Sequence, residues 1–265
     1  MDTVTAIGRR VLNFIVAGQV RCGASVLQTS IDMHPKATCY GELLHPSVKV
    51  RERLHKLYFG PTRSGTVPEW CEPGGWVSPE QYLTTRVFDH PASYEDAVGI
   101  KLLYPHIQNS DLWEYCHDCC NQGDFCVIHL YRNPLACYIS LKQAKQTGVW
   151  AEDINARTQA SRPAPIDPNI DELTTFCRWH TAHAAKLRQQ CDDRLEISYH
   201  ELIVNYRKVM TYVFEYLDLP RLDDVHPGVR RLKNRSIRDR LFDFTKTRSE
   251  VPADVRVHFD AEDLF

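Results

Sequence analysis

A glycine-bearing loop between an apolar run and a helical pattern constrains the fold of this chain most strongly. Residues 11–17 (VLNFIVA) are almost all apolar and rich in β-branched and aromatic side chains, which is typical of a strand buried on both faces. The loop 18–25 (GQVRCGAS) follows, and Val26, Leu27 and Ile31 then recur at helical spacing. The pattern therefore predicts a strand, a loop and a helix in direct succession.

Three more short apolar runs indicate further strands, at 98–103, 126–131 and 194–199. Helical patterns lie between or after them, and the clearest covers 207–217. One face of that helix is expected to carry Val209, Tyr212, Val213, Tyr216 and Leu217. Alternating strands and helices predict an α/β three-layer sandwich around a central, mostly parallel sheet. The length predicts that residues 1–265 form a single domain.

Two stretches differ in composition from the rest. Residues 60–80 are rich in Gly, Pro and Trp, and residues 155–170 are polar and rich in Pro. Both are expected to be long surface excursions, and excursions of this length in compact domains are often lids or binding loops. Irregular connections without a role are the alternative.

Composition and charge exclude several classes of partner. Lys and Arg number 32 against 34 Asp and Glu, a formal net charge of -2, so no global positive field exists to hold a nucleic acid. No apolar run approaches the ~20 residues that a membrane-spanning helix needs. The N-terminal apolar stretch is short and lacks a small-residue cleavage site, which disfavours a signal peptide. We therefore expect neither a nucleic-acid nor a membrane partner.

Ten cysteines are scattered along the chain, and several fall inside predicted strands and helices. A chain of this length needs no disulfide staples, so free thiols and a cytoplasmic location are expected. The cluster 116–120 (CHDCC) contains the C-x2-C spacing of one half of a zinc site. No matching second half follows, and we expect no metal; cysteines packed on a helix and its following turn are the favoured interpretation.

The first loop has the spacing of a phosphate-binding P-loop. Gly18 and Gly23 are separated by four residues, and Ser25 follows two places later, where backbone N–H groups can surround an anion at a helix N-terminus. In loops that bind ATP or GTP, a lysine directly follows the second glycine. Here that position is Ala24, and the nearest cation is Arg21. The loop is therefore predicted to hold an anion without that lysine; a plain strand-to-helix turn is the alternative.

A second candidate anion clamp lies in 126–140 (CVIHLYRNPLACYIS). The predicted strand ends at Arg132, a turn follows at Asn133-Pro134, and Ser140 lies on the next helix, eight residues after the arginine. Arginine offers a forked, permanently charged donor and serine adds a hydroxyl. The alternative is a surface arginine and a helix serine that share no ligand. A ligand bound by both clamps would carry two separated anionic groups.

Together the two segments resemble sulfotransferases that use 3′-phosphoadenosine 5′-phosphosulfate (PAPS). The family's 5′-phosphosulfate loop, commonly R-[ST]-G-[ST]-[ST]-L, is matched by RCGASV, and its 3′-phosphate motif by the RNP and the serine of the second clamp. The loop residues with this resemblance are Arg21, Cys22, Gly23, Ala24, Ser25 and Val26. Cys22 and Ala24 depart from the family pattern, because hydroxyl residues are usual there. The motifs are closest to the tyrosylprotein, carbohydrate and bacterial-type branches.

A third segment, 198–220, resembles the family's Y-E-D-L stretch and the helix after it. Tyr199 matches a tyrosine that in some members lies beside the adenine, while His200 replaces the usual glutamate and Glu201 keeps the next acidic position. In the family a late basic loop closes on the 3′-phosphate, and the candidates here are Arg231, Lys233 and Arg235. A solvated basic face is the alternative for these three residues. The resemblance covers most of residues 11–245.

The resemblance implies a P-loop-like nucleotide-binding fold and a defined reaction. A sulfuryl group would pass from PAPS, as co-substrate, to a hydroxyl or to an amine or carbamoyl nitrogen of a small-molecule acceptor, such as a natural product of secondary metabolism. The product from the donor would be the 3′,5′-bisphosphate, PAP. The family's chemistry implies no metal. The sequence leaves the oligomeric state and the acceptor open.

The resemblance also implies catalytic roles. Residues 32–46 resemble a stretch in which the glutamate after a glycine is the base in some members, and Glu42 is its match. His106, His45 or no dedicated base remain alternatives. Arg21 is the predicted cation at the leaving group, and Lys101 is a candidate second charge. Two rival functions stay open: a P-loop small-molecule kinase that uses ATP and magnesium, and a non-catalytic protein that binds PAPS or PAP.

Overall fold

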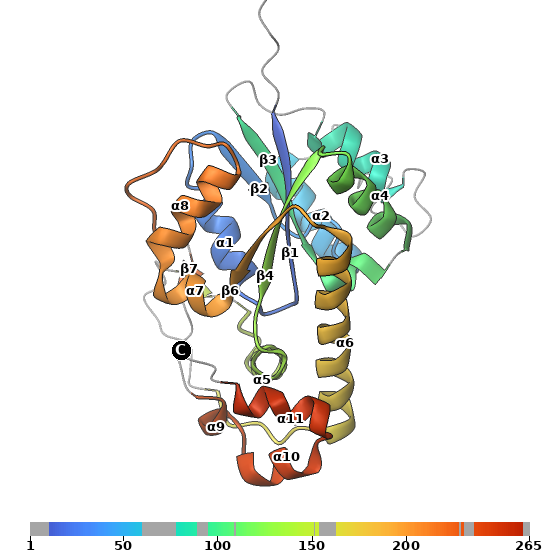
Figure 1. The fold of residues 1–265 in the computed structure, drawn as a ribbon, viewed down its shortest axis with the longest axis vertical. Helices are drawn as coiled ribbons and strands as arrows, with labels where there is room; N and C mark the ends of the chain where they lie inside the picture. Colours follow the sequence, from blue (N-terminus) through green and yellow to red (C-terminus); the bar gives the residue numbers. More distant parts are fainter. Residues whose placement is uncertain are drawn as a thin grey trace, which may run out of the picture.

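The computed structural model describes residues 11–59, 78–88, 95–108, 110–150, 152–153, 163–227, 229–230 and 236–261. Within them, a five-stranded sheet with the strand order β2-β3-β1-β4-β6 forms the centre of the molecule, and every pair of neighbours in it is parallel (Figure 1). Its strands are β1 (Leu12–Gly18), β2 (Ala37–Tyr40), β3 (Ala97–Leu103), β4 (Phe125–Tyr131) and β6 (Arg194–Ser198).

Helices cover both faces of the sheet (Figure 1). One face is covered by α1 (Ala24–Ile31), α7 (Tyr199–Val204) and α8 (Tyr206–Tyr216). The other is covered by α2 (Val48–Phe59), α3 (Pro79–Tyr82), the π-helix η2 (Leu83–Phe88), the 3-10 helix η3 (Tyr104–Gln108), α4 (Ser110–Asn121) and α6 (Ile170–Gln190). The predicted three-layer α/β sandwich with a parallel sheet is confirmed.

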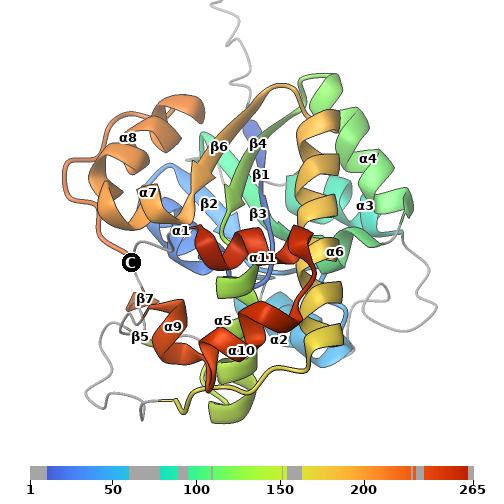
Figure 2. The same cartoon turned by 60° about the horizontal axis from the view of Figure 1, so that its bottom comes forward.

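A third group of helices lies at the end of the sheet where its strands finish. Figure 2 brings this group forward and shows α11 lying over α5 and beside α6, while α10 packs against α11 and α9. Its members are α5 (Pro134–Thr147), α9 (Ile237–Arg240), α10 (Phe244–Glu250) and α11 (Ala253–Asp260). They share an apolar cluster of their own with α6. A two-residue antiparallel pair, β5 (Glu152–Asp153) with β7 (Val229–Arg230), lies nearby.

The pleat of β1 explains why its sequence is apolar almost throughout. Phe14 and Val16 belong to the apolar cluster beneath α1 and α8, whereas Ile15 and Ala17 belong to the cluster on the opposite face. Successive side chains of a strand point to opposite faces, so a strand covered on both sides needs apolar residues at every position. The four strands predicted from apolar runs lie within one residue of their expected bounds at both ends.

Three expectations need correction. The strand β2 was not expected, because four residues are too short to show a pattern. Tyr212 is 48% exposed, since the buried face of α8 is turned toward Met210 and Phe214. In the stretch 155–170, Ile166 is 3% exposed and pairs with Leu241, so this part of it is anchored in the core.

Most of 60–80, and residues 155–162 of the other excursion, lie outside the described residues. In the described part of the chain, no helix is both long enough and apolar enough to cross a membrane.

A buried histidine in α6 generates a prediction about acid stability. His180 is 2% exposed, and neither ring nitrogen forms a hydrogen bond with another described residue. Burial, helped by the charge of His258, lowers its pKa to about 3 from 6.5. Below pH 6.5 His180 therefore binds a proton in the unfolded chain but stays neutral in the folded protein. The free energy of unfolding falls as the pH drops toward 3.

His180→Leu should remove this contribution, because leucine fills a similar space without a titratable group. The free energy of unfolding at pH 7 should not fall, and its decline between pH 6.5 and pH 4 should be shallower by up to about 1.4 kcal/mol per pH unit. Urea unfolding of both proteins across this range measures the difference. The same slope of unfolding free energy against pH in both proteins would contradict the lowered pKa of His180.

Candidate active site

The direction in which successive strands are added to the sheet reverses between β1 and β4. After β1 the chain moves to β2 at one edge of the sheet, and after β4 it moves to β6 at the other edge. Ligands of open parallel sheets bind outside the carboxyl ends of strands at such a reversal. Gly18 ends β1 and Tyr131 ends β4, so the two predicted anion clamps begin at adjacent strand ends.

Two glycines give the first loop its shape. A side chain at Gly18 would place its Cβ 2.5 Å from the carbonyl oxygen of Leu130 on the neighbouring strand. Gly23, which precedes α1, has φ 101°, and a Cβ there would lie 2.6 Å from the ring of Tyr199. Arg21 also has a positive φ of 68°, a conformation that costs free energy in a non-glycine residue and is common at functional sites. The loop therefore closes tightly before α1 begins.

The buried side chain of Cys22 anchors the loop to the core. Its side chain is fully buried in the apolar cluster beneath α1, and its backbone N–H donates to the Gln19 carbonyl over 3.1 Å. Burial raises the pKa of its thiol to about 11, so the group is neutral. Ala24 is also buried, and Val26 packs against the same cluster. The residues that replace the family's hydroxyls at 22 and 24 thus have side chains in the core.

The guanidinium of Arg21 is held by neutral acceptors. Its Nε donates to Ser140 Oγ over 3.1 Å, and its Nη1 donates to the carbonyl of Trp150. No carboxylate in the described part of the chain lies within ion-pair distance of it. Burial and the charge of Arg132 both lower the pKa of Arg21, although a guanidinium stays protonated at neutral pH. The site therefore holds a positive charge that an anion would stabilise.

Arg132 completes this cationic group. Its Nη1 donates to the Arg21 carbonyl over 3.1 Å, and its guanidinium lies 4.1 Å from the centre of the Tyr199 ring. The Asn133-Pro134 turn fixes its position: the Asn133 side chain caps α5 by accepting from Leu135 N, and proline occupies the first helical position. Arg21, Arg132, Ser140 and Tyr199, predicted from three separate segments, are therefore in one place.

A second polar group lies at the ends of β2 and β3. Lys101 Nζ donates to Ser25 Oγ over 3.1 Å and lies 3.1 Å from Glu42 Oε1. The other carboxylate oxygen, Oε2, lies 3.4 Å from His106 Nε2. Glu42 follows β2, which pairs with β3, the strand that carries Lys101. The loop serine, the lysine, the glutamate and the histidine thus form one continuous chain of contacts.

The contacts of this group fix the state of its carboxylate. Burial by itself would raise the pKa of Glu42, but the hydrogen bond from His106 and the charge of Lys101 outweigh it and lower the pKa to about 2. The N–H of Leu103 donates to His106 Nδ1 over 3.2 Å, which assigns the imidazole proton to Nε2, the atom that faces Glu42. Glu42 is therefore ionised, and His106 acts as a donor to it.

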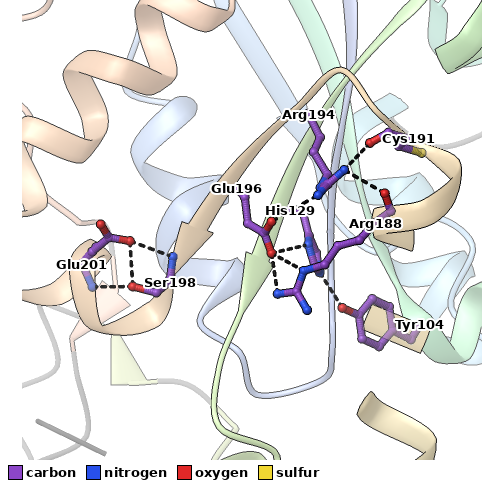
Figure 3. Close-up of polar contacts among 8 residues, drawn as sticks. All are labelled: Tyr104, His129, Arg188, Cys191, Arg194, Glu196, Ser198 and Glu201. Atoms are coloured by element: carbon purple, nitrogen blue, oxygen red, sulfur yellow. Dashed lines mark hydrogen bonds and ion pairs between the residues drawn. The ribbon is translucent and has the colours of Figure 1, made fainter. Parts of the chain in front are cut away.

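Next to this group, a buried network anchors the turn after β3 (Figure 3). Tyr104 OH lies 2.6 Å from Nε2 of His129, a fully buried residue of β4, and His129 Nδ1 lies 3.4 Å from Glu196 on β6. Burial lowers the pKa of His129 and raises that of Tyr104, so the phenol donates to a neutral ring. Arg188 pairs with Glu196 from the other side. Tyr104 thereby ties the start of η3, which carries His106, to the centre of the sheet.

Some predicted site residues lie elsewhere or outside the description. Arg231, Lys233 and Arg235 fall outside the described residues. The ring of His45 lies 5.7 Å from that of His106 and belongs to the neighbourhood of Glu42. Glu201 accepts from Ser198 N and so completes the capping box of α7, a signal that S-x-x-E already carries in the sequence.

Two contacts of the site could not be found from local pattern. Trp150 lies 6.0 Å from the Arg21 guanidinium and is 52% exposed, so an aromatic ring stands in solvent beside the loop. The pairing of His129 with Tyr104 joins β4 to the start of η3. The cysteines of 116–120 lie within α4, and the described residues contain no group of three or more potential metal ligands.

Comparison with known proteins bears on the fold. The structure is similar to the crystal structure of a sulfotransferase from Alicyclobacillus acidocaldarius, with a TM-score of 0.51 over 94% of this chain and 93% of that chain, at 12% sequence identity. The chain has a sulfotransferase fold. A sulfotransferase domain from the Synechococcus PCC 7002 olefin synthase aligns with a TM-score of 0.41 over 79% of this chain and 74% of that chain, at 15% identity. No family model and no curated protein matches the chain.

The ion pair of Lys101 with Glu42 generates a prediction about stability. Lys101 is 7% exposed, so Glu42→Gln would leave its ammonium group without a counter-charge among the described residues. We expect the free energy of unfolding at pH 7 to fall by about 1–3 kcal/mol. Ser25→Ala removes only a hydrogen bond to the same lysine and should cost less than about 1 kcal/mol. Urea unfolding measures both, and equal stability of Glu42→Gln and the unmodified protein would contradict the assignment.

The same ion pair has a defined pH dependence. The folded pKa of Glu42, about 2, lies below its ordinary value of 4.5. Its contribution to stability is therefore complete above pH 4.5 and is lost as the pH falls toward 2.

Proposed function

We propose that this protein is a sulfotransferase that moves a sulfuryl group from PAPS to a small-molecule acceptor. The observation that carries the proposal is the half-buried Arg21 guanidinium, which has neutral hydrogen-bond partners among the described residues and a second arginine beside it, at the N-terminal end of α1. Such a group needs an anion, and the loop N–H groups and the helix dipole favour the same sign of charge.

The two clamps suit a donor with separated anionic groups. The loop 21–25 would hold the 5′-phosphosulfate, with Arg21 at the oxygen that joins phosphorus and sulfur. Arg132 and Ser140 would hold the 3′-phosphate, and Tyr199 would lie beside the adenine. In the structure Ser140 accepts from Arg21 and Arg132 donates to the loop backbone, so a bound donor would replace internal partners of both clamps.

The sulfuryl transfer itself requires that the acceptor be positioned in line with the sulfur and that the charge on the leaving oxygen be stabilised. The acceptor atom forms a bond to sulfur while the bond from sulfur to the bridging oxygen breaks, and the electron pair of that bond leaves with PAP. Arg21 and Lys101 would stabilise the negative charge that grows on the bridging oxygen. The acceptor proton passes to Glu42. No step requires a metal ion, which agrees with Ala24 in place of the nucleotide lysine.

The contacts of Glu42 favour it over His106 as the base. His106 Nδ1 already accepts from Leu103 N, and its other nitrogen donates to Glu42, so both ring nitrogens already have partners. Glu42 is ionised but weakly basic, with a pKa of about 2. It would therefore take the proton late, when bonding to sulfur has made the acceptor group acidic. The acceptor class, oxygen or nitrogen, stays part of the proposal.

A small-molecule kinase is the rival that the loop spacing supports, and Ala24 opposes it. A kinase of this type would bind ATP with magnesium through a lysine after the second glycine. Lys101 reaches the loop at Ser25, but it comes from β3 and is paired with Glu42.

Nine described cysteines are free thiols, which supports a reducing compartment such as the cytoplasm.

The donor site can be tested by binding. Arg132→Ala should weaken PAP by roughly 10- to 150-fold, since one charge-assisted clamp contributes about 1.5–3 kcal/mol. Arg207→Ala, which removes the same charge from an exposed position on α8, should leave the affinity unchanged. Isothermal titration calorimetry measures both, with circular dichroism to confirm folding. Equal PAP affinities of the two variants would contradict the assignment of Arg132 to the 3′-phosphate.

The base can be tested by turnover once an acceptor screen with PAPS has found a substrate. Glu42→Gln should lower kcat by about 10²- to 10⁴-fold while PAP affinity is kept. His106→Asn, whose side-chain oxygen can still accept from Leu103 N, should retain much more activity. The opposite result, full turnover without Glu42 and none without the imidazole, would assign the base to His106.

A further inference from the structure

The short segment that carries Glu42 lies between the end of β2 and the start of α2. β2 ends at Tyr40, and Gly41 and Glu42 follow it directly. The backbone of the segment turns twice, with hydrogen bonds from Leu43 N to the Gly41 carbonyl and from His45 N to the Glu42 carbonyl. Both bonds lie within the segment, so the place of the Glu42 carboxylate also depends on what the segment packs against.

A phenol of α2 contacts this segment next to Glu42. The backbone N–H of Gly41 donates to the Tyr58 hydroxyl over 3.2 Å. Gly41 is buried and Tyr58 is half-buried, and the Tyr58 ring packs edge-on against Tyr40 with the ring centres 5.1 Å apart. A Cβ at Gly41 would lie 3.2 Å from the same hydroxyl oxygen, so α2 approaches the backbone closely at this point.

The same hydroxyl also contacts the helix that follows the first loop. Gln28, a buried residue of α1, donates from Nε2 to the Tyr58 hydroxyl over 3.1 Å. A phenol oxygen can accept hydrogen bonds from both groups. α1 begins directly after Gly23, in the loop that would hold the 5′-phosphosulfate. One hydroxyl therefore joins the helix of the donor loop to the residue before Glu42.

α2 holds the other end of the segment through a second side chain. Arg51 Nη1 donates to the carbonyl of His45 over 2.7 Å and to the carbonyl of Pro46 over 3.1 Å. Tyr58 and Arg51 thus contact backbone groups on the two sides of Glu42, and both come from the same helix. The segment is fixed from α2 at two points.

The place of Glu42 decides whether it can act as a base. A general base must lie within hydrogen-bond reach of the proton that it takes. A displacement of about 1 Å, caused by a change away from the reacting atoms, can lower a rate by about 100-fold. Lys101 and His106 hold the two carboxylate oxygens, and the backbone at Gly41 determines where those oxygens can reach.

We propose that Tyr58 is a positioning residue for Glu42. Its hydroxyl fixes the backbone at Gly41 relative to α1, so that the carboxylate is in place beside a bound donor. The inference rests on the proposed function, because it concerns the transfer in which Glu42 would take the acceptor proton. Tyr58 acts through the Gly41 backbone and transfers no proton itself.

Tyr58→Phe removes the hydroxyl and keeps the ring, and Tyr206→Phe is its matched control. Tyr206 is half-buried, and its hydroxyl donates over 2.7 Å to Ser30 Oγ, which also lies on α1. Each variant therefore loses one phenol hydroxyl that is bonded to the same helix. The bond lost in Tyr206→Phe leads to Ser30 and not to the segment of Glu42.

Nuclear magnetic resonance of the His106 side chain reports the place of Glu42 without turnover. His106 Nε2 faces Glu42 Oε2 over 3.4 Å, and its side chain is 1% exposed, so the proton on this nitrogen is protected from exchange. Its chemical shift depends on the charge-assisted hydrogen bond to the carboxylate. We expect Tyr58→Phe to move this signal in the same direction as Glu42→Gln does, and Tyr206→Phe to leave it unchanged. An unmoved His106 signal in Tyr58→Phe would overturn the proposal.

Gly41→Ala tests the same contact from the other side. Gly41 does not have a positive φ, so alanine is compatible with its backbone, but the added methyl group would press on the Tyr58 hydroxyl. We expect Gly41→Ala to move the His106 signal in the unmodified background and to add little in the Tyr58→Phe background. Effects of the two substitutions that simply add would contradict the proposal, because contacting residues are expected to be coupled.

Turnover with PAPS and the acceptor found by screening tests the catalytic consequence. We expect Tyr58→Phe to lower kcat by about 10- to 100-fold, while the affinity for PAP and the KM for the acceptor stay within about twofold. Tyr206→Phe should keep its kcat, and circular dichroism verifies that both variants are folded. An unchanged kcat in Tyr58→Phe, or an equal fall in both variants, would overturn the inference and leave the proposed function intact. Failure of the unmodified protein to bind PAP would instead remove the proposed function and the catalytic role of Tyr58 together.

Discussion

Two like charges at the end of the sheet are the constraint on which the site depends. Arg21 and Arg132 meet at the reversal between β1 and β4, where Arg132 donates to the Arg21 carbonyl and both side chains are half-buried. The protein stabilises them with dipoles: a serine hydroxyl, two backbone carbonyls and the face of a tyrosine ring. Among the described residues, Arg21 has neutral hydrogen-bond partners that hold its guanidinium without cancelling its charge, which leaves that charge available to a ligand.

The rest of the fold keeps these groups together. Gly18 allows β1 to end against the backbone of β4, and Gly23 leaves room for the Tyr199 ring beneath Arg132. The capped start of α5 sets the direction of Arg132 and carries Ser140 to Arg21. The second polar group, which contains Glu42 and Lys101, joins the same loop through Ser25. The loop 21–25 therefore connects the residues that would bind the donor with those that would deprotonate the acceptor.

The sequence predicted what is encoded within short stretches. The apolar run before Gly18 and the Arg132-Asn133-Pro134 turn are local patterns, and their strands and helices appear where expected. Contacts between segments that are distant in the sequence could not be predicted from local patterns. Arg21 and Ser140 are 119 positions apart, and Glu42 reaches Lys101 only because the unexpected strand β2 pairs with β3. The inward direction of Cys22 likewise depends on how α1 packs on the sheet, which no loop motif contains.

The central claim is that this site binds a nucleotide through two separated phosphates and without a metal. Isothermal titration calorimetry of the unmodified protein in EDTA, with PAP and with adenosine 5′-monophosphate, tests it most directly. The structure predicts micromolar binding of PAP and at least about tenfold weaker binding of the monophosphate, which lacks the group for Arg132 and Ser140. Equal affinity for the two nucleotides would contradict the second clamp, and binding of neither would contradict the donor site as a whole.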